Sequence, residues 1–361
     1  MIGATLGAYL LARFARTILA VFGAIFALIA LVDFVEMFRR AAGIPQAGAG
    51  TIALLSMMRT PAISEQVLPF AVLGGSMFTF VALSRKLELV VARAAGVSVW
   101  QFLGPPLLVV LSIGIFSVAA FNPVAALLKQ RADQIETSLF GGVQRAGSDS
   151  SLWIHQSSVD GQAIIRAEHS SDKGTVLANV SVFGFDQEDR FQERIDAARA
   201  HLLQGFWRLK DARVIAPGEK PHAFGVYLLA TNLTPAQVTQ SFVAPESVPF
   251  WDLPNVVRRT EQAGLDATAY RLRYQTLLAR PLLLVAMVLI AACFSLRFFR
   301  FGGVSRTVAG GVISGFVLYV ATKLVADLGG AGLLSAPVAA WSPAVVASML
   351  GTLVLLNQED G

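Results

Sequence analysis

Residues 104–127 read GPPLLVVLSIGIFSVAAFNPVAAL, and they lie within a run from Ala94 to Leu128 that contains no charged side chain. This run is longer than the roughly 20 apolar residues that a helix needs to cross a bilayer. Five further stretches of 16 residues or more also lack charge, namely 17–32, 66–84, 281–296, 307–322 and 328–358. The sequence therefore predicts an α-helical, polytopic membrane protein.

Charged residues are tolerated near the ends of a membrane helix. We therefore expect six transmembrane helices, three on each side of a long central segment, near 17–38, 61–83, 104–127, 275–296, 304–326 and 334–356. Thr60-Pro61 is expected to begin the second helix, because proline is accepted in a first helical turn, with 51–60 as an interfacial turn before it. Acidic Asp33 and Glu36 at the far end of the first run favour a retained helix over a cleaved signal peptide.

The composition separates the central segment from its flanks. Only 15% of the 361 residues are charged, whereas soluble domains carry about 25%. Between Lys129 and Arg273, however, lie 16 of the 29 Lys/Arg and 17 of the 24 Asp/Glu. The net charge of +5 thus comes from the hydrophobic flanks, and it indicates a membrane surface or anionic lipid as partner, and no nucleic acid.

The central segment has the pattern of a β domain. Short alternating or β-branched runs are separated by turn residues, and they occur at 151–156, 162–168, 175–185, 205–215 and 223–231. Such spacing is typical of a sandwich or a barrel of the jelly-roll type, between which the pattern does not choose. From Pro245 to Arg273 the pattern becomes helical. We expect three domains: 1–128 with helices one to three, 129–265 with the β domain, and 266–361 with helices four to six.

Lys and Arg in the short loops predict the orientation. Basic residues precede helix one, separate helices two and three, and separate helices four and five, and they are Arg13, Arg16, Arg85, Lys86, Arg93, Arg297, Arg300 and Arg306. These loops share one side, which the positive-inside rule makes cytoplasmic. The β domain then lies outside. Arg39 and Arg40 break the rule at the outer end of helix one, either as anchors that snorkel to the interface or as a site for anionic lipid headgroups.

No catalytic motif is found. The four histidines, His155, His169, His201 and His222, match no zinc spacing, and nucleotide-binding and hydrolase motifs are missing from the sequence. The single Cys293 cannot form a disulfide within the chain. We therefore expect no enzyme activity in this chain itself, no cofactor and no metal.

The loop segment 84–98 predicts a short amphipathic helix. Ser84 is a good N-cap, Glu88 falls in the second turn, and Gly96 is placed to end the helix. The apolar face comprises Leu87, Val90, Val91 and Ala94. Such a helix lies on a lipid surface or inserts into a groove of a partner, and the acidic Glu88 favours a protein partner.

These residues carry a resemblance to a known family. The segment 84–98, SRKLELVVARAAGVS, closely resembles the coupling-helix signature of the LptF/LptG permeases, the membrane subunits of the lipopolysaccharide-export ABC transporter. LVDFVEMFRR at 31–40 is similar to the end of the first helix in the G subunit. YRLRYQTLLARP at 270–281 resembles the entry to the fourth helix, and NLTP at 232–235 resembles a motif late in the periplasmic domain.

The resemblance implies a periplasmic β-jellyroll and a set of partners. One G and one F subunit stand on a cytoplasmic ATPase dimer, so the implied partners are an LptF-like permease, an LptB-like ATPase dimer, an LptC-like anchor and a periplasmic jellyroll protein. Lipopolysaccharide leaves the bacterial inner membrane for this periplasmic bridge, and the ATPase partner hydrolyses ATP. Two other functions remain open: a membrane scaffold whose β domain docks a periplasmic partner, and another lipid or lipoprotein ABC permease.

The resemblance also implies site residues. Arg85, Glu88 and Arg93 would dock on the ATPase, with Gly96 ending the coupling helix and Glu88 paired to a basic residue of the partner. The residues expected at the lipopolysaccharide headgroup are Asp33, Glu36, Arg39, Arg40, Arg271 and Lys323. Family members commonly carry lysine where this chain has Asp33, so Asp33 would bridge to a neighbouring cation or act through a divalent ion. Lys323 with Asp327 is either functional or a self-neutralising pair.

Overall fold

The computed structural model describes residues 4–42, 48–140, 152–158, 161–171, 174–186, 190–218, 220–232, 244–262, 266–296 and 304–359. The chain divides into two compact units. The first, here the membrane unit, combines Met1–Leu139, Glu246–Leu253 and Thr268–Gly361. The second, here the β unit, combines Phe140–Pro245 and Pro254–Ala267.

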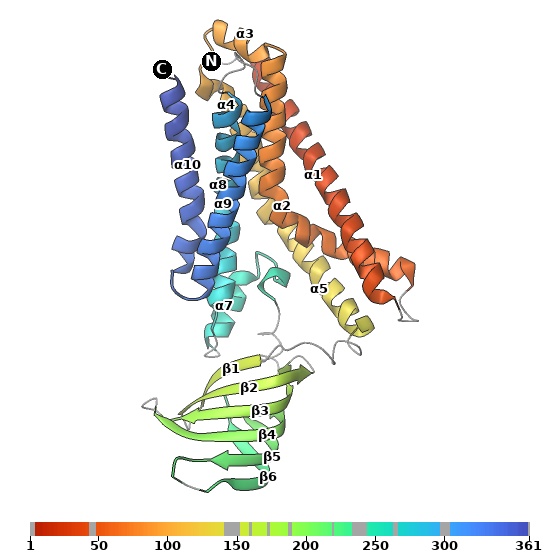
Figure 1. Cartoon of the computed structure of the whole chain (residues 1–361), viewed down its shortest axis with the longest axis vertical. Helices are drawn as coiled ribbons and strands as arrows, with labels where there is room; N and C mark the ends of the chain where they lie inside the picture. The colour runs from red at the N-terminus through yellow and green to blue at the C-terminus, as the bar shows by residue number, and fades with distance from the viewer. Residues whose placement is uncertain are drawn as a thin grey trace. The chain divides into compact units, whose positions relative to one another are not determined.

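Six helices of the membrane unit are long and apolar enough to cross a bilayer (Figure 1). They are α1 (Ala4–Ala41), α2 (Ala49–Arg85), α4 (Val99–Phe116) continued by α5 (Asn122–Phe140), α8 (Thr268–Ser295), α9 (Val304–Gly330) and α10 (Ala336–Glu359). A π-helical turn of five residues, η1 (Ser117–Phe121), joins α4 to α5. The prediction of six membrane helices in two groups of three is confirmed, and the chain is a multi-pass membrane protein.

The helices extend beyond the apolar runs that predicted them. The expected start of the second helix at Thr60-Pro61, after an interfacial turn, is wrong, because α2 begins at Ala49 and Pro61 is a buried interior residue. Hydroxyl groups satisfy backbone carbonyls beside the proline: Thr60 Oγ1 donates to the Ser56 carbonyl at 2.8 Å and Ser64 Oγ to the Pro61 carbonyl at 2.9 Å. In apolar surroundings a continuous helix with a proline leaves fewer backbone groups unsatisfied than an interrupted one.

Close approaches between helices define the core of the membrane unit. Phe14 of α1 and Phe80 of α2 are fully buried, and their rings meet edge to face with centroids 4.9 Å apart. Gly75 of α2 lies so near Ile18 of α1 that a Cβ at residue 75 would be 2.8 Å from the Ile18 Cα. The backbones of α1 and α2 are therefore in contact over this stretch.

A Gly75→Ala substitution is expected to destabilise the protein, because the new methyl group meets backbone atoms of Ile18 that cannot rotate away. Overpacking of this kind costs about 1–3 kcal/mol. Gly74→Ala is the matched control, since its Cβ would lie 4.0 Å from Val21 Cγ1 and both variants gain the same helix propensity. Thermal unfolding in one detergent measures the difference. Equal midpoints for the two variants would mean that α1 moves aside at no cost.

Within its described residues the β unit contains one antiparallel sheet of six strands, whose order in the sheet is their order in the chain. The strands are β1 (Leu152–Ser158), β2 (Gly161–Ser171), β3 (Val176–Phe185), β4 (Phe191–Leu203), β5 (Phe206–Ile215) and β6 (His222–Ala230). After them come the short helices η4 (Pro245–Ser247) and α7 (Leu253–Gln262), in the predicted helical connector. The predicted fold class, six membrane helices with an inserted β domain, is confirmed, although β4 was not expected from the sequence.

A buried glutamine links the first strand to the last two. Gln156 Oε1 on β1 accepts hydrogen bonds from Trp207 Nε1 of β5 at 3.1 Å and from Thr231 Oγ1 at 2.6 Å, just beyond β6. Gln156 Nε2 donates to the Ala230 carbonyl at 3.3 Å. Trp207 is fully buried in the apolar core of the sheet. The sequence did not choose between a sandwich and a barrel. The described strands form a single sheet, and its curvature brings β1 close enough to β5 and β6 for these hydrogen bonds.

Candidate functional site

The two ends of the membrane helices carry different groups. At one end α2 and α4 are joined by the short helix α3 (Glu88–Ala94), and this is called the α3 end. At the other, called the insertion end, the chain leaves α5 for the β unit. The predicted coupling residues lie at the α3 end, and the predicted headgroup residues lie toward the insertion end.

Residues with positive φ flank α3. Leu87, with φ 59°, precedes it, and Gly96, with φ 82°, follows it. The Gly96 N–H donates to the Arg93 carbonyl at 2.9 Å and the Val97 N–H to the Ala92 carbonyl at 3.1 Å. This pair of bonds closes a helix whose last turn is followed by a left-handed glycine. The predicted end of the helix at Gly96 is confirmed.

The start of α3 differs from the expectation. Ser84 belongs to α2, is buried, and its Oγ has no hydrogen-bond partner among the described residues, so the predicted N-cap is wrong. Glu88 consequently lies in the first turn of α3. A carboxylate is favourable there because the first turn carries unpaired N–H groups and the positive end of the helix dipole.

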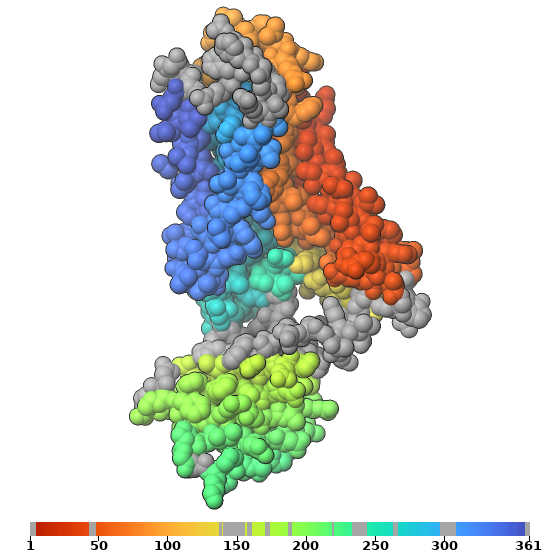
Figure 2. Space-filling view, viewed as in Figure 1, coloured from red at the N-terminus to blue at the C-terminus, as the bar shows by residue number. Residues whose placement is uncertain are grey.

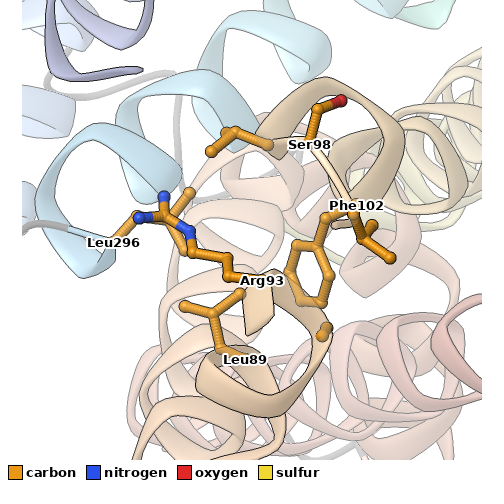
Figure 3. Close-up of a pocket in the computed structure, with 8 residues that line it drawn as sticks. Leu89, Arg93, Ser98, Phe102 and Leu296 are labelled. Atoms are coloured by element: carbon orange, nitrogen blue, oxygen red, sulfur yellow. The ribbon is translucent and has the colours of Figure 1, made fainter. Parts of the chain in front are cut away.

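α3 buries one side and exposes the other. Leu89 and Ala92 are buried, and Leu89 lines a shallow pocket with Phe102 of α4 and Leu296 after α8 (Figure 3). Leu87, just before α3, and Val90 and Val91 on α3 belong to the predicted apolar row, and they are 61%, 57% and 66% exposed. The chain alone therefore leaves an apolar surface on α3 uncovered.

Glu88 is bound by α1. Arg13 Nη1 donates to both oxygens of the Glu88 carboxylate, at 3.0 and 2.9 Å, and the Tyr9 hydroxyl donates to Oε2 at 3.1 Å. The Arg13 guanidinium also contacts the Tyr9 hydroxyl and lies 5.5 Å from the centroid of its ring. Arg85 and Arg93, in contrast, are exposed. The structure brings Glu88 together with α1 and leaves the two predicted basic residues open.

At the insertion end of α1, one carboxylate serves two arginines. Glu36 accepts hydrogen bonds from Arg39 Nε and Nη2, at 3.0 and 2.9 Å, and from Arg40 Nε at 2.8 Å. The arginine side chains remain 75% and 50% exposed. A guanidinium has five N–H donors, so both arginines keep donors for a further anion, and the cluster has a net charge of +1.

Asp33 lies one turn away and faces α2. Its Oδ1 is 3.8 Å from Arg59 Nε, and Arg59 Nη1 also donates to Glu136 Oε2 of α5 at 2.8 Å. Asp33 Oδ2 is buried with no hydrogen-bond partner among the described residues. Of the two roles expected for Asp33, the geometry supports the bridge to a neighbouring cation.

The remaining predicted headgroup residues lie apart from the Glu36 cluster. Arg271 is exposed on the first turn of α8. Lys323 Nζ lies 3.4 Å from Asp327 Oδ1 in α9, and these side chains are 66% and 62% exposed. Nearby, Lys129 donates to Glu246 at 2.9 Å, and this hydrogen bond holds the pKa of the Glu246 carboxyl below its usual value. The structure thus gives Lys323 a local partner and does not gather these residues with Arg39 and Arg40.

A buried charged network, absent from the sequence predictions, lies inside the membrane unit. Glu65 of α2 is 3% exposed, and its carboxylate contacts Arg280 of α8, whose side chain is 8% exposed. Asn122 Nδ2 donates to both Glu65 oxygens, at 3.0 and 3.1 Å, and Arg273 Nη2 approaches at 3.5 Å. Asn122 Oδ1 accepts the backbone N–H of Phe250 at 3.0 Å. One carboxylate thus joins α2, α5, α8 and the segment before α7.

The sequence contained a signal for this network. Glu65, Asn122 and Arg280 all fall within predicted spans, and ionisable residues within a membrane span are functional candidates by default. The rule that indicates Lys323 and Asp327 as candidates holds equally for Glu65 and Arg280. Arg297, Arg300 and residues 233–235 of the NLTP motif lie outside the described residues.

Chemically, these sites offer charged and apolar groups for binding. Among the described residues no group of three His, Cys, Asp or Glu side chains is placed to hold a metal ion. Two comparisons with known proteins bear on the function. Residues 8–357 match the family model described as lipopolysaccharide export system permease LptF/LptG. A search of curated proteins finds no match.

Proposed function

The chain belongs to the LptF/LptG family of lipopolysaccharide export permeases, and we propose that it is an LptG-type subunit that delivers lipopolysaccharide to a periplasmic bridge. In this proposal it pairs with an LptF-like permease on an LptB-like ATPase dimer, which hydrolyses the ATP. An LptC-like anchor and a periplasmic jellyroll protein receive the lipid. The membrane is the bacterial inner membrane, with the β unit in the periplasm.

The exposed apolar row of α3 is the observation that carries this proposal. A short helix that presents Leu87, Val90 and Val91 to solvent, with basic Arg85 and Arg93 beside them, needs a partner that covers it. A groove on a cytoplasmic ATPase is such a partner, since amphipathic helices bind grooves by their apolar face. Basic residues at the α3 end favour a cytoplasmic location for it.

The exposed surfaces of the membrane helices support a second permease subunit. Figure 2 shows α1 and α9 at the surface of the membrane unit, with α2 between them. In the most apolar stretches of these two helices, only 6% and 17% of the residues are buried within the chain. Their exposed side chains include Leu28, Val32 and Val35 of α1 and Ile313, Phe316 and Val317 of α9. We infer that a partner permease and the lipid substrate cover these faces.

The joint substitution Arg39→Gln/Arg40→Gln is expected to weaken lipopolysaccharide binding by about tenfold or more. Each charge-assisted hydrogen bond contributes about 1.5–3 kcal/mol, and 1.4 kcal/mol is a factor of ten. Photo-crosslinking to lipopolysaccharide from a probe at Phe38 measures the loss. The control is Arg258→Gln/Arg259→Gln, an exposed adjacent pair on α7. Unchanged crosslinking of the first variant would make Arg39 and Arg40 topological anchors only.

The assembly itself is tested by native purification. The tagged chain, extracted with its lipid by a nanodisc-forming polymer, is expected to bring down a second permease, an ATPase and lipopolysaccharide detectable by lipid mass spectrometry. Recovery of a periplasmic protein without any ATPase would instead favour a membrane scaffold. Recovery of lipoprotein in place of lipopolysaccharide would favour another class of ABC permease.

A further inference from the structure

The contact between Glu88 and α1 joins α3 to the helix that carries Arg39 and Arg40 at its other end. Three hydrogen bonds from Arg13 and Tyr9 hold the Glu88 carboxylate, and the side chains of Arg13 and Glu88 are only 19% and 33% exposed. A partly buried pair with several donors is held more firmly than a single exposed ion pair. α3 is therefore attached to α1 as well as to the neighbouring helices α2 and α4.

α1 is one continuous helix, and we expect it to move as a single rigid element. It is a single helix of 38 residues, about 57 Å long. Proline occurs inside α2, α4, α8 and α10 but not in α1, and proline is a common cause of helix kinks. Arg13 lies near one end of this helix, and Arg39 and Arg40 lie at the other, about 40 Å away.

α1 is packed at both ends and more open between them. Leu10, Phe14 and Ile18, next to Arg13, are buried in the core of the membrane unit. Beyond them most of the apolar stretch of α1 is exposed, with Leu28, Leu31 and Val32 about 60% exposed. Near the charged cluster the helix is packed again, because Met37 and Ala41 are 1% and 6% exposed and Asp33 lies 3.8 Å from Arg59 of α2. A displacement applied at Arg13 thus acts at one packed end of α1, and the charged cluster lies at the other.

We propose that Arg13 is the positioning residue through which movement of α3 reaches α1, and through α1 the arginines at its insertion end. This inference rests on the proposed function, in which an ATPase moves α3. Through its ion pair with Arg13, Glu88 holds the predicted coupling helix α3 against α1, a helix that spans the membrane. Arg13 contacts neither the ATPase nor the lipid in this role, and it acts through Glu88.

The test is a charge exchange scored as lipopolysaccharide released per ATP hydrolysed, with the reconstituted transporter in proteoliposomes. Arg13→Gln and Glu88→Gln are each expected to lower this ratio several-fold while the ATPase stays bound. The double exchange Arg13→Glu/Glu88→Arg is expected to restore much of the loss seen in Arg13→Glu and Glu88→Arg alone. Arg16→Gln is the matched control, since Arg16 is exposed and has no hydrogen bond or ion pair within the described residues.

A second variant set does not depend on the exchanged pair fitting its site. In a Cys293→Ala background, Arg13→Cys/Glu88→Cys is joined by a short bismaleimide. Cross-linking is expected to raise the release ratio above that of the same protein left unlinked, because a covalent link replaces the ion pair. A merely structural pair would change thermal stability and leave the ratio of release to hydrolysis unaltered.

The outcomes separate the inference from its premise. If Arg13→Gln releases as much lipopolysaccharide per ATP hydrolysed as Arg16→Gln does, the Arg13–Glu88 contact does not transmit movement, and the inference is overturned. If the double exchange is as defective as Glu88→Arg and the cross-link gives no gain, Glu88 serves a partner and not Arg13. If the unaltered chain binds no ATPase, the proposed function itself fails, whatever the variants do.

Discussion

Arg280→Met, with Glu65 left in place, is expected to yield little folded protein. The substitution leaves a carboxylate that is 3% exposed without its main counter-charge, and breaking a buried pair in this way costs about 3–5 kcal/mol. Whole proteins are stable by only about 5–15 kcal/mol. Thermal unfolding by fluorescence-detected size exclusion, together with the yield after extraction, measures the effect.

The control for this prediction removes both charges. Glu65→Leu/Arg280→Met keeps the bulk of the two side chains, and replacing a buried pair by apolar residues is often neutral or stabilising. The double variant is therefore expected to recover most of the unfolding midpoint lost in Arg280→Met. If Arg280→Met unfolds at the same temperature as the unaltered protein, then Arg273, at 3.5 Å from Glu65, suffices as counter-charge.

Val90→Asp/Val91→Asp is expected to abolish co-purification of the ATPase while leaving the permease folded. Both valines are more than half exposed in the chain alone, so the change is tolerated by the monomer. In a docked helix each would be a buried anchor, and anchors of this kind contribute about 2 kcal/mol or more. Losing one such anchor weakens association by roughly 30-fold, and losing both weakens it further.

The matched control for the α3 face is Val226→Asp. Val226 lies on β6 and is 54% exposed, close to the 57% of Val90, but it belongs to the β unit. Pull-down of the ATPase, quantified against the permease, is expected to be unchanged for this control. Retention of the ATPase by Val90→Asp/Val91→Asp would mean that the apolar row of α3 faces lipid and that docking uses another surface.

The membrane helices were predictable because the bilayer imposes a simple requirement. A span needs about 20 residues of low polarity, and the sequence marks six charge-free runs. The ends were less predictable, since α2 begins at Ala49 and α5 continues to Phe140, both beyond the charge-free runs. The end of α3 was predictable because Gly96 has a local role, whereas Ser84 was absorbed into the preceding helix.

β4 shows why local preference fails in the β unit. Its central residues, including Glu193, Ala197 and Ala200, are better helix formers than strand formers. Ile195, Ala197 and Ala200 nevertheless face the core, and β3 and β5 pair on either side. The strands that pair with β4 determine its structure. Because β3 and β5 are separate segments of the sequence, the residue preferences of β4 alone do not reveal this pairing.

The charged contacts were the least predictable part of the candidate site. The contacts of Glu36 with Arg39 and Arg40 follow from the i,i+3 and i,i+4 spacing within one helix. The partners of Glu65 and Asp33 come from other helices, and Arg59 and Arg280 are paired only once the helices are placed. Helical periodicity indicates which residues share a face, but it does not indicate which face of another helix they meet.

The π turn between α4 and α5 has a consequence for chain length. A regular helix turns about 100° per residue, and a π turn holds one residue more than an α turn. Every residue after Ser117–Phe121 is therefore set back in phase by about one residue, and in that phase Asn122 meets Glu65 and Glu136 meets Arg59. Deleting one residue from this turn would restore a regular α turn and keep α5 in its present phase, whereas an α turn of unchanged length would rotate both partners away by about 100°. The turn thus holds one residue more than the placement of Asn122 and Glu136 requires.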